Sequence, residues 1–196
     1  APRELPKEEP QTALRRLHVK RPVPVDALYM AFHMCNRHQP EYYVYDMITD
    51  VLSNGRSSRF IQSLIQEQQL FTSIDAFISG SLDEGLIQIT GKPAEGISLE
   101  QAEQAVWKEL ERLKTIPVTE NELEKVKNRY ESEQIFNNMN YLNVATNLAY
   151  FELIGQAEDI NSEVEKYRSV TAAQIQEIAA LCFVPKNCSI LYYQKS

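Results

Sequence analysis

The sequence marks three helix starts more clearly than any other feature. A Ser or Thr stands three residues before a Gln or Glu in the segments 98–101, 119–122 and 171–174. In this capping-box spacing the hydroxyl oxygen accepts a hydrogen bond from a backbone N–H of the first turn, and the longer side chain reaches back to the capping residue's own N–H. The downstream half of the chain is therefore expected to contain at least three helices that begin at these points.

Short apolar runs between turn residues predict the strands. Arg15–Lys20 alternates weakly and is expected to form an edge strand, and Ser189–Gln194 a final strand. Val25–Cys35 is apolar at both odd and even positions, which is typical of a strand covered on both faces. Phe71–Ser79 and Leu86–Thr90 are expected to pair through the short turn between them.

Apolar residues at helical spacing predict the helices. A helix opened by Pro40 is expected to end at Asn54-Gly55, and the helix that begins near residue 120 runs toward Ile154, with a bend at its asparagine-rich centre. The other helices are expected at about 58–68, 99–113 and 172–183. Since strands occur in hairpins and at both ends, the sequence predicts an α+β fold, with a mixed or mostly antiparallel sheet of about five strands and helices packed on one face.

The overall charge and apolar content exclude several function classes. The 196 residues carry 20 basic and 27 acidic side chains, a net charge of −7, which disfavours nucleic-acid and anionic membrane partners. No apolar run reaches the length of a membrane span, about 18 residues or more. Three cysteines do not make a disulfide framework and are interpreted as buried thiols, which leaves both cytoplasmic and periplasmic soluble locations open.

The first residues differ from the rest of the chain. The segment APRELPKEEP contains three prolines and no apolar core, so it is neither a signal peptide nor a folded start. We interpret residues 1–12 as the remnant of an interdomain linker and residues 13–196 as a single domain.

The stretch LSNGRSSRF, residues 52–60, contains residue types that are common in active sites. It has one glycine and no lysine, so it does not match a phosphate-binding loop. It also lacks the second glycine of a nucleophile elbow, and no histidine follows it to act as a base. We therefore expect Gly55 to end a helix, Ser57 or Ser58 to cap the next helix through its side-chain oxygen, and Arg56 and Arg59 to anchor the turn to nearby carboxylates or helix ends.

The three histidines, His18, His33 and His38, do not form a zinc-peptidase motif, because neither H-E-x-x-H nor H-x-x-E-H occurs. His33 and Cys35 are expected on one strand face, but a catalytic zinc normally takes three protein ligands. We interpret them as a buried His and a buried Cys. The sequence thus predicts no catalytic residue and no metal ligand set in this chain.

Four segments in order resemble a known family. Asp46–Phe60 is similar to its helix ending in a Gly-x-Ser-Ser-Arg-Leu turn, and Leu64–Leu70 to its L-x-x-E-x-x-L segment before a strand. Val118–Asn128 is similar to its T-x-x-E-L-x-x-x-K helix start, and Val170–Ile175 precedes the closing strand. Over about residues 12–195 the chain resembles the C-terminal, non-zinc domain of the insulinase, pitrilysin and mitochondrial-processing-peptidase zinc peptidases.

The resemblance implies a two-layer sandwich of the LuxS/MPP-like metallohydrolase type. It implies the substrate-chamber or structural domain of a zinc-dependent endopeptidase that acts on oligopeptides or unfolded polypeptides, inactive by itself. Zinc would be held by an upstream domain, where it polarises the scissile carbonyl. Ile65 and Thr72 stand where substrate-binding domains of the family often carry an Arg and a Tyr. Because Ile and Thr cannot stabilise an oxyanion as that pair could, no substrate-binding residue is carried over.

Two further interpretations remain open. The chain could be a non-catalytic structural subunit, like the family's core-protein relatives in respiratory complexes, or a pseudo-peptidase partner of an active subunit. It could also be a small-molecule-binding module that uses the strand face of Tyr29, Ala31, His33 and Cys35. The expected partners are the upstream zinc domain, a homodimer or heterodimer subunit, and the peptide substrate. The sheet face toward the upstream domain is expected to be partly apolar and exposed.

Overall fold

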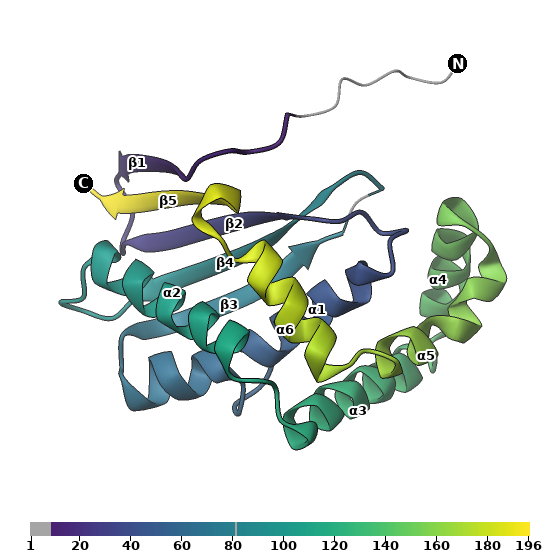
Figure 1. Cartoon of the computed structure of the whole chain (residues 1–196). Helices are drawn as coiled ribbons and strands as arrows, with labels where there is room; N and C mark the ends of the chain where they lie inside the picture. Colours follow the sequence, from purple (N-terminus) through teal and green to yellow (C-terminus); the bar gives the residue numbers. More distant parts are fainter. Residues whose placement is uncertain (1–8, 81) are drawn as a thin grey trace, which may run out of the picture.

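A five-stranded mixed sheet forms one layer, and helices cover one of its faces (Figure 1). The computed structural model describes residues 9–80 and 82–196. The strand order is β1-β5-β2-β4-β3; β1 and β5 are parallel, and the other neighbouring pairs are antiparallel. The predicted α+β class and mixed sheet are confirmed. The strands are β1 (Arg15–Arg21), β2 (Ala27–Met34), β3 (Phe71–Ser79), β4 (Gly85–Pro93) and β5 (Cys188–Lys195).

The helices begin where the capping residues predict. Ser98, Thr119 and Thr171 each accept from the backbone N–H three residues on, and each capping box is complete. The α-helices are α1 (Glu41–Ser53), α2 (Leu99–Thr115), α3 (Glu120–Asn137), α4 (Tyr141–Ile154), α5 (Glu163–Arg168) and α6 (Ala172–Cys182). A π-helical segment, η1 (Ile61–Glu67), and two 3-10 turns, η2 (Ala157–Ser162) and η3 (Pro185–Asn187), complete the order.

The core lies between the sheet and the layer of α1, α2 and α6. Met30 and Phe32 of β2 are buried on the helix side, and Phe32 meets Phe183 and Trp107 edge to face, with ring centroids 5.0 and 5.6 Å apart. Such aromatic contacts add to the stabilisation from apolar burial. The helix layer therefore holds one face of the sheet firmly and leaves the other face free to form a surface.

The prediction that β2 is covered on both faces is wrong. Its residues alternate: Leu28, Met30 and Phe32 are buried, whereas the Tyr29 side of the strand opens outward, with Tyr29 itself 41% exposed. The pattern misled because the second face carries apolar residues but has no covering layer among the residues described.

The prediction of one long helix from residue 120 to 154 is also wrong. The chain forms α3 and α4, which the asparagine-rich segment separates, so the break falls where a bend was expected. The Asn140 side chain accepts a hydrogen bond from the Leu142 N–H at 2.9 Å and caps the start of α4. The short side chain of asparagine bonds readily to nearby backbone groups, which favours the end of one helix and the start of the next over a continuous helix. In Figure 1, α4 stands apart from the sheet and from α2. The short helices η2 and α5 were not predicted.

Two predicted segments are only partly described. Most of the predicted linker, residues 1–8, and Ser81 in the β3–β4 turn lie outside the described residues. At the linker's end, the Gln11 amide donates to the Cys188 carbonyl at 2.6 Å, so residue 11 is held against β5. The boundary at residue 12 stays a prediction. None of the helices that the structure describes is long and apolar enough to cross a membrane.

Candidate functional site

The turn after α1 has a structural role, because it links α1 to the next helical segment. Gly55 has a φ of 96°, a left-handed conformation that glycine adopts without steric cost, and it ends the helix as predicted. The predicted serine cap is wrong: the Ser58 hydroxyl donates to the Gly55 carbonyl at 2.7 Å, and the following segment begins without a side-chain cap. The Ser58 backbone N–H donates to the same carbonyl at 3.0 Å, so both polar groups of this serine close the turn on Gly55.

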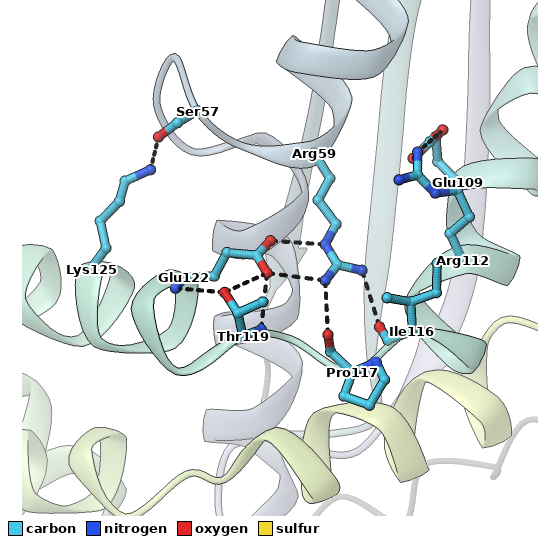
Figure 2. Close-up of polar contacts among 9 residues, drawn as sticks. All are labelled: Ser57, Arg59, Glu109, Arg112, Ile116, Pro117, Thr119, Glu122 and Lys125. Atoms are coloured by element: carbon cyan, nitrogen blue, oxygen red, sulfur yellow. Dashed lines mark hydrogen bonds and ion pairs between the residues drawn. The ribbon is translucent and has the colours of Figure 1, made fainter.

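Arg59 anchors this turn to the start of α3, as predicted (Figure 2). Its Nε donates to Glu122 Oε1 at 3.0 Å and its Nη2 to Glu122 Oε2 at 3.2 Å. Glu122 Oε2 also accepts from the Thr119 N–H at 3.0 Å, so one carboxylate closes the capping box and holds the arginine. A bidentate ion pair of this kind fixes the relative orientation of the two side chains as well as their distance. Arg56 is exposed, and within the described residues its guanidinium makes no polar contact.

Ser57 is the one hydroxyl of this stretch that meets a basic side chain, because the Lys125 ammonium hydrogen-bonds its Oγ (Figure 2). Sequence reasoning missed this contact, since the two residues lie 68 positions apart. Both side chains are exposed. A hydrated ammonium donates its protons and cannot remove one from a serine, so the pair does not make a nucleophile.

The histidines belong to three segments: His18 lies on β1, His33 on β2 and His38 in the loop before α1. His18 and His38 are exposed, and His18 meets Tyr192 edge to face with ring centroids 4.7 Å apart. His33 is half-buried, and its carbonyl accepts from the Asn187 amide at 3.0 Å. Within the described residues, no three His, Cys, Asp or Glu side chains are grouped so that they could hold a metal ion. The residues present therefore do not fit a zinc site.

The cysteines are free thiols, as expected. Cys182 and Cys188 are buried and Cys35 is half-buried against the core. Burial and, to a smaller extent, the Glu41 carboxylate raise the pKa of Cys35 to about 11. Burial likewise raises the pKa of Cys182 to about 12. Because the thiolate is the reactive and metal-binding form, neither thiol is prepared for catalysis.

Ile65 and Thr72 occupy structural positions. Ile65 is partly buried against the core, and the exposed Thr72 hydroxyl donates to the Lys92 carbonyl at 3.1 Å. Neither side chain offers a charged or aromatic group to a ligand. That they replace a substrate-binding pair stays a prediction.

The open face of the sheet is a candidate binding surface. Tyr29 lies opposite Leu191 in the β2–β5 register, and Leu191 lies opposite Leu17 in the β1–β5 register, so the three form one row across the sheet. A shallow hollow of about 310 Å³ lies over this row. Its lining includes the polar side chains of Arg15 and Gln88. A mostly apolar surface with a few polar groups at its edge is typical of a contact site for peptide or protein. The small-molecule interpretation of this face stays a prediction.

A buried polar cluster lies at the other end of the molecule, between α1, α3 and α5. Arg37 and Glu163 are 8% and 7% exposed and form an ion pair, and the Arg37 Nη1 also donates to the Tyr43 hydroxyl at 3.0 Å. Nearby, the Tyr167 hydroxyl donates to Asp46 Oδ2 at 2.5 Å. Burial raises the pKa of Asp46. Sequence reasoning missed this cluster because its members come from segments more than 100 residues apart.

The comparisons with known proteins agree with this fold. Residues 1–130 match the family model described as the peptidase M16 inactive domain. The chain belongs to this family. No curated protein matches the sequence.

Solved structures give the same fold. A protease from Helicobacter pylori aligns over 98% of this chain with a TM-score of 0.92 and 18% identity. The chain spans 47% of that protein's length, about half. The inactive peptidase domain of a Bordetella parapertussis protein aligns over 89% of this chain and 95% of its own, with a TM-score of 0.79 and 19% identity. Complex III from Candida albicans contains a chain that aligns over 90% of this chain and 45% of its own, with a TM-score of 0.76 and 16% identity.

Proposed function

We propose that this chain is the non-catalytic C-terminal domain of a zinc-dependent endopeptidase that acts on oligopeptides or unfolded polypeptides. The observation that carries the proposal is the open sheet face, where the row of Leu17, Leu191 and Tyr29 is left uncovered by the helix layer. A flat, partly apolar face of this kind suits a wall of a substrate chamber, against which a partner domain or an extended peptide packs. The inactive-domain family and the Helicobacter pylori protease, of which the chain spans about half, support this role.

In this proposal the domain contributes shape and no chemistry. The ion pair of Arg59 and Glu122 joins the turn after α1 to α3 and stiffens the helices behind the wall. Zinc, and the glutamate that activates water, would come from an upstream domain. Ile65 and Thr72 would then leave substrate binding to the open face and to the partner domain.

The test uses the full-length protein that carries this segment. We expect it to hydrolyse an unstructured peptide, to lose this activity on chelation and to regain it with zinc, whereas the present chain alone stays inactive. Tyr29→Asp, which places a charge on the open face, is expected to lower kcat/KM about tenfold or more. Leu181→Asp, an exposed position on α6, is the matched control and is expected to change nothing. Absence of an H-x-x-E-H motif upstream, or hydrolysis that resists chelation, would overturn the proposal.

A second candidate is a structural subunit or a pseudo-peptidase partner of an active subunit. The likeness to a chain of Candida albicans complex III favours it, as do Ile65 and Thr72. This candidate predicts a full-length protein that hydrolyses no peptide alone and co-purifies with a second subunit. Chelator-sensitive hydrolysis by the protein purified alone would exclude it.

A further inference from the structure

The helix α4 is more apolar than its surroundings explain. Glu152 is its one charged residue, yet Phe151 is its one buried residue. Asn143, Thr146 and Asn147 are polar but uncharged, and a helix with so little charge is normally enclosed by protein over much of its surface. Here it belongs to a helical arm, residues 135–154, made of the end of α3, the connecting turn and α4, which stands apart from the sheet (Figure 1).

The exposed apolar surface of this arm is large. Its five most exposed large side chains are between 70% and 92% exposed: Phe136, Met139, Tyr141, Leu142 and Leu153. At roughly 200 Å² for each large side chain, they present about 770 Å² of accessible area. This is close to the area of about 800 Å² that each partner buries in a standard protein interface. The arm alone therefore offers enough surface for a stable protein contact.

One stripe of exposed residues on α4 has a pattern that suits packing against the same stripe of a second copy. Leu142, Ala145, Ala149 and Leu153 are exposed and share a helix face at the spacing i, i+3, i+7 and i+11. The order large, small, small, large reads the same from both ends. Two antiparallel copies related by a two-fold axis at the middle of α4 would place Leu142 of one opposite Leu153 of the other, while the alanines allow the backbones to approach closely.

The charges do not oppose this pairing. Glu152 lies at the rim of the stripe, and its carboxylate accepts from the Ala157 N–H of its own chain at 3.1 Å. In the antiparallel arrangement the two Glu152 side chains lie at opposite ends of the contact. A membrane surface is disfavoured as the occupant because the chain carries a net charge of −7.

We propose that the helical arm is a homodimer interface, in which α4 of one chain packs antiparallel on α4 of a second copy. This inference does not rest on the peptidase role of the open sheet face, because it uses a different surface. The dimer would cover the apolar stripe and leave the hollow over Leu17, Tyr29 and Leu191 free.

The first test is the oligomeric state of the chain by analytical ultracentrifugation across a concentration series. We expect a reversible dimer, and we expect Leu142→Glu and Ala149→Glu to raise its dissociation constant about tenfold or more. Leu181→Glu, at a side chain 65% exposed on α6, is the matched control and is expected to leave it unchanged. Circular dichroism checks that each variant stays folded. A wild-type chain that stays monomeric, or a dimer that only Leu17→Glu dissociates, would overturn the proposal.

The second test fixes the geometry by cross-linking. Equivalent positions 142 in the two copies would lie about 16 Å apart along the helix, at about 1.5 Å per residue, which is too far for a disulfide. The double variant Leu142→Cys/Leu153→Cys is therefore expected to form a covalent dimer on oxidation, whereas each single variant and the wild type, with its three native thiols, stay uncross-linked. Equal cross-linking of the Leu142→Cys variant alone would refute the antiparallel arrangement, and arm-dependent binding of a monomer to anionic vesicles would assign the surface to a membrane instead.

Discussion

The buried ion pair of Arg37 and Glu163 gives the sharpest test of the energetics. Both residues are more than 90% buried, and the pair joins the β2–α1 loop to α5. Glu163 Oε2 also accepts from the Tyr43 hydroxyl at 3.2 Å, and the Arg37 guanidinium lies over the Tyr42 ring at 4.4 Å. A charge in this position is stable only while its partner is present, because burial without a counter-charge costs several kcal/mol.

Removing both partners is therefore expected to cost about as much as removing one, because the second substitution takes away the charge that the first leaves unpaired. Glu163→Gln leaves the Arg37 charge buried and is expected to lower the free energy of unfolding by about 3 kcal/mol, at the lower end of the range because Tyr43 still accepts from Arg37. Arg37→Met leaves the Glu163 carboxylate with Lys166 at 3.7 Å as its remaining cation and is expected to cost about as much. The double variant removes both charges and keeps the loss of packing and hydrogen bonds, so about 3 kcal/mol is expected in total.

The assay is urea unfolding of the wild type, both single variants and the double variant. The costs of the two single substitutions are expected to exceed the cost of the double substitution by about 3 kcal/mol, which is the coupling between the two charges. The dependence of the unfolding free energy on urea should stay the same across the set, because the surface exposed on unfolding does not change. Additive costs, within about 0.5 kcal/mol, would show that the pair is solvated and would refute the reasoning.

Three further outcomes are expected. Arg59→Ala should lower the free energy of unfolding by about 2 kcal/mol, because it removes a bidentate ion pair. Glu122→Ala should cost about 1 kcal/mol more, because it also opens the capping box at Thr119. Equal losses of the two variants in urea unfolding would contradict this double role of Glu122. Ser57→Ala should change the unfolding free energy by less than about 0.5 kcal/mol and leave peptide hydrolysis by the full-length protein intact; a loss of activity above about tenfold would instead reveal a nucleophile. Burial raises the pKa of Asp50 to about 6, so the folded state keeps a proton that the unfolded chain releases. The contribution of this carboxyl to stability is thus full below its unfolded pKa and is lost as the pH rises through about 6. In the wild type, the free energy of unfolding should therefore fall by about 2 kcal/mol between pH 4 and pH 7 on account of Asp50, and Asp50→Asn should remove this fall. Parallel pH profiles of unfolding free energy for the variant and the wild type would contradict this prediction.

Features set by neighbouring residues could be predicted from the sequence. The capping boxes at Ser98, Thr119 and Thr171 depend on contacts within three residues, so their side-chain types were sufficient. The strand β3 was predicted with both of its ends because turn residues bound it. The Arg59 contact with Glu122 was predicted only as a contact with some carboxylate, because its partner lies 63 residues away.

Contacts between distant segments could not be predicted. Ser58 was expected to cap a helix, but its hydroxyl finds the Gly55 carbonyl because the turn folds back on itself. The Arg37–Glu163 pair spans 126 positions and carries no local pattern. A single sequence contains the residues of such a cluster without any indication that they meet.

The two places where the hydrophobic pattern overestimates burial have a common cause. The strand β2 is apolar on both faces, and α4 has only one charged residue, yet each leaves apolar surface exposed in the described chain. Apolar residues that stay exposed gain nothing from folding, and they add to the tendency to aggregate. In the proposed function and in the proposed dimer, other protein covers these two surfaces and completes their burial. Under these proposals, a partner that binds either surface raises the apparent stability of the chain by mass action, and occupancy of the open sheet face does not compete with dimerisation through the arm.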